Sequence, residues 1–258
     1  MERPKYLEYR HRRDQISCYH VERTNVITLE KPAPALLRLV GKKTSAKRET
    51  FSEEWELELR TTDVRPDYSA MIKTQVTKAV LLGDKNEAGY EGQSNPETEF
   101  LSETVDRFGL LSDLHGTLPS PHILVFPEEP QLAGGEWERA RVEILPTVGP
   151  TGAITGYSEI EVSYDCRVET FGKENGLEYA DISFKGAGKK GSENDSVRQE
   201  FAVGGTARFA IREGYLMSAT VVRSMANHLE HHVLTRTSNE EFRHALGGKE
   251  EAVGGMRL

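Results

Sequence analysis

The densest group of residues that could carry chemistry lies near the carboxyl end, where positions 227–232 read Asn-His-Leu-Glu-His-His. On a helix, His228 and His232 would lie four residues apart on one face, with His231 beside them. Two neutral imidazoles in that arrangement can bind zinc or nickel, with a neighbouring glutamate as third ligand. We therefore predict His228, His231 and His232 as metal ligands if the segment is helical. A solvated polar segment is the alternative.

Two other groups have the composition of known sites without their spacing. Residues 186–191 read Gly-Ala-Gly-Lys-Lys-Gly, but a phosphate-binding loop needs its lysine after the last glycine and a helix behind it. We predict a hairpin loop there. His115 and His122 flank a stiff segment with two prolines, and Asp113 is nearby. A histidine–carboxylate pair can be a general base, but no serine or cysteine in a nucleophile context accompanies it, so we predict no catalytic residue and no cofactor.

The elements that must position these residues are strands, because apolar residues alternate with period two. In residues 53–60 a tryptophan and two leucines fall on one face and glutamates on the other. Residues 69–80 are rich in β-branched side chains, and the connection at 62–67 is turn-like. We therefore predict a β-hairpin over 53–80.

The same pattern continues along most of the chain. A polar loop is expected at 83–98, a junction rich in proline and glycine at 127–135, and a polar tail that can form a helix after Met225. A second hairpin is expected over 157–184, with its turn at Gly-Lys-Glu-Asn-Gly. Further strands are predicted at residues 15–29, 36–40, as a pair within 100–118, at 137–145 and over 198–224.

The two halves of the chain echo each other, which predicts an internal duplication. The Tyr-Ser-Ala-Met-Ile segment at 68–72 corresponds to Tyr-Ala-Asp-Ile-Ser at 179–183, and an Arg-Phe pair recurs at 107 and 208. We predict a mainly β protein with two similar antiparallel halves, arranged as a sandwich or half-barrel. The predicted units are 1–126, 127–234 and a polar flexible tail at 235–258.

A series of loosely spaced motifs, mainly within residues 126–220, carries a family resemblance. They are Phe-Pro-Glu-Glu-Pro at 126–130, Gly-Gly-Glu-Trp at 134–137, Tyr-Ala-Asp-Ile at 179–182, Gly-Gly-Thr-Ala-Arg-Phe at 204–209 and Gly-Tyr-Leu at 214–216. This stretch resembles bacterial families of unknown function. The resemblance implies a two-lobed, highly curved antiparallel sheet and a protein that is commonly exported or lipid-anchored. It implies no activity.

The charge is distributed unevenly. The 258 residues carry a net charge of −8, yet residues 1–50 contain twelve Lys or Arg against six Asp or Glu. A basic end on an acidic body can contact an anionic membrane surface. Nucleic acid is not an expected partner, because few aromatic residues interleave these charges.

Several features indicate a cytoplasmic protein. No segment reaches the ~20 apolar residues that a transmembrane helix needs. No secretory signal opens the printed sequence. Cys18 and Cys166 match no ligand or redox spacing, which favours buried thiols in a reducing compartment. An exported form whose leader has been removed is the alternative.

These observations favour a non-enzymatic binding or scaffold protein that acts on a protein partner through sheet edges and polar loops. One alternative is a carrier of a hydrophobic small molecule in a cavity between curved sheets. The other is a metal-dependent enzyme that uses the 228–232 histidines.

Overall fold

The computed structural model describes residues 3–31, 45–82, 100–116, 118–148, 154–191, 198–229 and 232–245, and every structural statement below concerns these residues. Their eleven strands form one antiparallel sheet, with no helix among them. The strands are β1 (Ile16–Lys31), β2 (Ser45–Val64), β3 (Ala70–Leu82), β4 (Phe100–Val105), β5 (Leu111–Gly116), β6 (Glu136–Val148), β7 (Ile154–Glu174), β8 (Leu177–Lys190), β9 (Arg198–Ala210), β10 (Tyr215–Leu229) and β11 (His232–His244). The prediction of a mainly β, antiparallel protein is confirmed.

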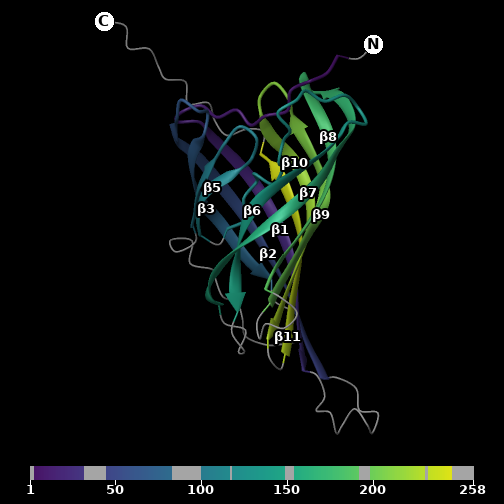
Figure 1. Ribbon diagram of the computed structural model, residues 1–258. Helices are drawn as coiled ribbons and strands as arrows, with labels where there is room; N and C mark the ends of the chain where they lie inside the picture. Colours follow the sequence, from purple (N-terminus) through teal and green to yellow (C-terminus); the bar gives the residue numbers. More distant parts are fainter. Residues whose placement is uncertain are drawn as a thin grey trace, which may run out of the picture.

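The sheet curls into a nearly closed, barrel-like shape (Figure 1). Its strand order is β5-β4-β3-β2-β1-β11-β10-β9-β8-β7-β6, so the first and last strands pair in the middle. The edge strands β5 and β6 approach each other without being paired neighbours. β1 and β11 join the two sides into one continuous sheet. The predicted division of the chain into two similar halves stays a prediction.

Both predicted hairpins are present. Residues 53–80 lie in β2 and β3, and residues 157–184 lie in β7 and β8. The turn between β7 and β8 contains Asn175 and Gly176, whose φ angles are 51° and 85°. Positive φ at both central residues is typical of a type I′ turn, which matches the twist of the flanking strands.

Each strand turns one face toward the interior, because successive side chains alternate across the sheet. Large buried side chains include Leu57, Ile160, Tyr164, Phe209 and Phe242, which come from four different strands. One connected core therefore lies inside the curled sheet.

Residues 118–126, the connection between β5 and β6, run through this interior without strand pairing and are here called the interior segment. Leu124, Val125 and Phe126 are fully buried. Because buried backbone groups must be paired, side chains take the place of a neighbouring strand. The Trp137 Nε1–H donates to the Val125 carbonyl at 2.7 Å, and the Arg139 Nη1–H donates to the Phe126 carbonyl at 2.8 Å.

The segment before β1 covers one end of the interior. Its Leu7 and Tyr9 side chains are buried. Lys5 pairs with Gln131, and the Arg10 N–H donates to the Gly214 carbonyl at 3.1 Å. The Tyr9 hydroxyl accepts the Leu124 N–H at 3.2 Å, which fastens the interior segment to this cover.

The expected polar, helix-forming tail after Met225 is wrong for the described residues. β10 continues to Leu229, and residues 232–244 form β11. The inward row of β11 contains Arg236, Ser238 and Glu240 among its residues. Because these inward side chains are polar, the sequence lacks the alternation of apolar and polar residues that indicates a strand. Residues 246–258 lie outside the described residues.

Three other expectations concern loops and one short strand. The strand at 36–40 and the loop at 83–98 lie outside the described residues. The predicted loop at 186–191 is wrong, because β8 continues to Lys190. Gly186 and Gly188 lie within that strand, and a Cβ at Gly188 would lie 2.4 Å from the Glu161 carbonyl oxygen.

No described helix is long and apolar enough to cross a membrane.

The turn at Gly109 gives a first test of how tightly the interior segment is packed. Gly109 and Gly176 have nearly the same positive φ, 84° and 85°. A Cβ at Gly109 would lie 2.1 Å from the Leu124 carbonyl oxygen, whereas one at Gly176 meets nothing within 4 Å. Both alanine variants carry the αL penalty of about 1–2 kcal/mol. We expect Gly109→Ala to lose about 2 kcal/mol more unfolding free energy in urea than Gly176→Ala. Equal losses would contradict the tight packing.

Candidate functional site

A cavity of about 300 Å³, here called the interior cavity, lies between the sheet and the interior segment. Its apolar wall includes Trp55, Leu145, Phe201 and Met225. Its charged wall consists of Arg23, Glu53, Arg141, Glu143, Arg223, Arg236 and Glu240. Seven charged side chains around one interior space are unusual, since such residues are seldom buried unless they are paired.

Glu240 is the most deeply buried of these charges, at 2% exposure. Strand register explains its partners, because β11 places Glu240 opposite Arg23 of β1 and opposite Val221 of β10. The Arg23 Nε lies 2.9 Å from Glu240, and Arg223, two residues beyond Val221, also contacts it. Burial by itself would raise the pKa of Glu240, but Arg223 and Arg23 outweigh it and hold the pKa below its ordinary value. Glu240 is therefore a carboxylate shared by two guanidinium groups.

Arg236 has a different environment, two inward positions along β11. Its Nε and Nη2 donate to the Asn25 Oδ1 at 3.1 and 2.9 Å. The Asn25 amide in turn donates to Glu53 at 2.8 Å. Burial, together with the charge of Arg23, lowers the pKa of Arg236. Arg236 forms no salt bridge to a carboxylate within the described residues.

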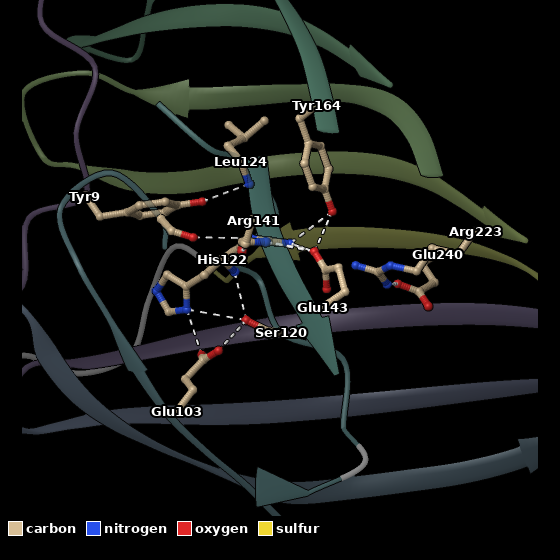
Figure 2. A network of polar contacts seen from close by, with 11 residues as sticks. Tyr9, Glu103, Ser120, His122, Leu124, Arg141, Glu143, Tyr164, Arg223 and Glu240 are labelled. Atoms are coloured by element: carbon tan, nitrogen blue, oxygen red, sulfur yellow. Dashed lines mark hydrogen bonds and ion pairs between the residues drawn. The ribbon is translucent and has the colours of Figure 1, made fainter. Parts of the chain in front are cut away.

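Arg141 of β6 connects the cavity wall with the interior segment, as Figure 2 shows. Its Nε donates to Glu143 at 2.7 Å, and the same carboxylate accepts the Tyr164 hydroxyl. Its Nη1 donates to the carbonyls of His122, at 2.7 Å, and of Gly109, at 3.3 Å. Arg141 therefore satisfies buried backbone acceptors and a buried carboxylate together.

A second polar cluster, formed by Glu103, Ser120 and His122, lies at the lower left of Figure 2. The His122 Nδ1 lies 2.7 Å from the Glu103 Oε1, and the Ser120 hydroxyl donates to the Glu103 Oε2 at 2.8 Å. The Ser120 Oγ also accepts the His122 N–H at 3.0 Å. In a catalytic triad the serine and the acid bond to opposite ring nitrogens. Here Ser120 lies 3.4 Å from the same Nδ1 that the acid contacts, so the cluster holds the interior segment and presents no activated nucleophile.

From the sequence, His122 was expected near Asp113 and His115, but its partner is Glu103. The side chains of Asp113 and His115 lie outside the described residues. A signal for Glu103 was present, because it lies between Leu101 and Val105 on the buried face of β4. A carboxylate within an apolar row needs a buried partner.

Two of the predicted metal ligands, His228 and His232, lie at facing ends of β10 and β11. His228 is in β10 and pairs with Val233, and the backbone of His232 is in β11, paired with Leu229. The helical spacing that motivated the site is therefore not formed. His231 and the His232 side chain lie outside the described residues, and no described group of three His, Cys, Asp or Glu could hold a metal ion. Metal binding at His228, His231 and His232 stays a prediction.

The two cysteines are free thiols. Cys166 is buried, and desolvation raises its pKa to about 12. Cys18 is partly exposed, and burial also raises its pKa. A thiol with a raised pKa is a poor nucleophile and metal ligand, which agrees with their interpretation as small apolar residues.

Fold and site together define an all-β protein whose single curled sheet encloses a charged cavity. No protein-family model and no curated protein matches the sequence. Among solved structures, DynF from the dynemicin biosynthesis pathway of Micromonospora chersina is similar over 92% of this chain and 84% of its own. The identity is 8% and the TM-score 0.24, so the likeness carries no functional argument. The β-rich fold is consistent with the expected resemblance to bacterial families with curved sheets. The resemblance to those families itself stays a prediction.

Arg141 gives a test of the buried network. Arg141→Met keeps the bulk of the side chain but removes the cationic partner of Glu143 and the donor to two backbone carbonyls. We expect a loss of about 3–5 kcal/mol in unfolding free energy, as for other broken buried ion pairs. Arg167→Met is the matched control, since Arg167 lies on the exposed face at 52% exposure and should cost about 1 kcal/mol or less. Urea titrations of both variants make the comparison, and similar losses would contradict the assignment.

His11 gives a test by pH. It lies against His122, with ring centroids 5.3 Å apart, and its Nε2 is buried without a hydrogen-bond partner. Burial and the neighbouring His122 lower the pKa of His11 from 6.5 to about 3. Below pH 6.5 the unfolded chain takes up a proton that the native protein does not.

We therefore expect the unfolding free energy to fall as the pH drops from 6.5 toward 3, by up to about 1.4 kcal/mol per pH unit. His11→Gln should flatten this slope, leaving a remainder from His244, whose pKa burial also lowers, and from Glu240, whose pKa its arginine partners hold low. The control His20→Gln should keep it. Urea titrations between pH 6.5 and pH 3 measure the slope of the unfolding free energy for each protein. An unchanged slope in His11→Gln would contradict the lowered pKa of His11.

Proposed function

We propose that this protein is a non-enzymatic binding protein that holds a small organic molecule in the interior cavity. The observation that carries the proposal is a cavity of about 300 Å³ with apolar and charged walls. Ligand sites usually combine apolar walls with a few fixed polar groups, at volumes from about 300 Å³ upward.

The charged wall is already organised without a ligand. Glu240 is held by two arginines and a serine, and Arg141 by Glu143 and two carbonyls. Groups fixed in this way lose little conformational freedom when a ligand binds. The two serines that line the cavity, Ser120 and Ser238, each donate to a carboxylate instead of to an imidazole acting as base. Both features favour binding over chemical transformation.

The charged wall of the cavity changes which of the functions expected from sequence is favoured. A purely hydrophobic ligand would desolvate seven charged side chains without replacing their water, so a ligand with a polar end fits better. Action as a scaffold through sheet edges stays a prediction. The curled sheet brings its two edge strands toward each other (Figure 1), which favours the interior as the binding surface.

A test uses two tryptophan substitutions three residues apart in β10. Met225 faces the cavity at 7% exposure, and Val222 faces outward at 44%. We expect Met225→Trp to weaken binding of the neutral two-ring probe 2-naphthamide by about tenfold or more, because the indole fills the cavity. Val222→Trp should bind the probe like the wild type. Isothermal titration calorimetry measures both affinities, and circular dichroism verifies folding.

Native mass spectrometry of gently purified wild-type protein gives an independent measurement. We expect a bound small-molecule mass that is reduced in Met225→Trp and retained in Val222→Trp. A clean apo mass together with no probe binding would contradict the proposed function.

A further inference from the structure

We propose that the ligand of the interior cavity is a small organic anion, and that Arg236 binds its carboxylate. The inference rests on the proposed function and specifies the chemical class of the ligand. It concerns how charge is distributed among the residues of the cavity wall.

The charged wall has an excess of positive charge. Four arginines line the cavity against three glutamates. The remaining acid near the wall, Glu103, is 1% exposed and is occupied by His122 and Ser120. One guanidinium charge is therefore left without a carboxylate of its own in the described part of the chain.

The contacts identify Arg236 as that guanidinium. Glu240 already serves Arg23 and Arg223, and Glu143 serves Arg141. Glu53 accepts the Asn25 amide and lies 3.8 Å from Arg23. Among the described residues, Arg236 donates only to the neutral Asn25 oxygen. Arg236 is half-buried, and desolvation makes a cation with neutral hydrogen-bond partners costly. An anionic ligand would offset that cost.

The geometry of the guanidinium suits a carboxylate. The bonds to Asn25 occupy Nε and one N–H of Nη2. The N–H groups of Nη1 and the second one of Nη2 remain, and this pair matches two carboxylate oxygens. Asn25 is fully buried and holds the guanidinium in place.

Strand register places an apolar surface beside this cation. Arg236 of β11 lies directly opposite Met225 of β10, which lies opposite Phe201 of β9. All three line the cavity. A row of this kind fits an amphipathic anion whose carboxylate meets Arg236 and whose apolar body lies on Met225 and Phe201.

The test compares two probes of nearly equal shape, 2-naphthoate and its neutral analogue 2-naphthamide, on the full chain by calorimetry. We expect the wild type to bind naphthoate at least about tenfold more tightly. Arg236→Met should abolish this preference, so that both probes bind with equal affinity. Arg167→Met, on the outer face, should retain the preference.

The outcomes separate this inference from the proposed function. Equal binding of both probes by the wild type would overturn the anion assignment and leave cavity binding intact. A preference that survives in Arg236→Met would overturn the assignment to Arg236. If Arg236→Met does not fold, Arg236→Lys keeps the charge without the fork, and we expect it to prefer naphthoate with reduced affinity. If the wild type binds neither probe, the proposed function itself is contradicted.

Discussion

The pairing of β1 with β11 is the interaction on which the rest of the structure depends. It joins the first and last strands of the described chain, and without it the sheet would separate into β1 to β5 and β6 to β11. The same ladder places Arg23 opposite Glu240. The contact that joins the two parts of the sheet therefore also fixes the most deeply buried carboxylate of the cavity wall. Stability and the charged wall of the cavity are coupled through one strand pair.

The interior segment is the second constraint. A connection that passes through a core without strand partners needs side-chain donors and acceptors for its backbone groups. Tyr9 of the segment before β1 and Trp137, Arg139 and Arg141 of β6 supply them. Because Arg141 also binds Glu143, the connection between β5 and β6 and the cavity wall are held by the same group. Changes in the segment should therefore be felt in the cavity.

Most of the fold could be predicted from period-two alternation, and the site could not. The hairpin over 53–80 and the Asn-Gly turn before Leu177 are local features that the chain encodes within a few residues. The interior row of β11 was missed because Arg236 and Glu240 look like surface residues in a one-dimensional pattern. Glu103 carried a visible signal in its apolar row, but its partner His122 lies nineteen residues away. The histidines at 228–232 drew attention by composition, and their helical spacing is not formed.

The sequence by itself determined that the chain forms antiparallel strands, where the tightest turns fall and which faces are apolar, because these depend on neighbours within a few positions. Only the tertiary structure decided which charges meet. Arg23 and Glu240 are far apart along the chain, and their contact depends on β1–β11 register. A charged residue in an inward row is costly alone and stable once paired. Whether it marks a surface or a site is therefore settled only when the sheet closes around it.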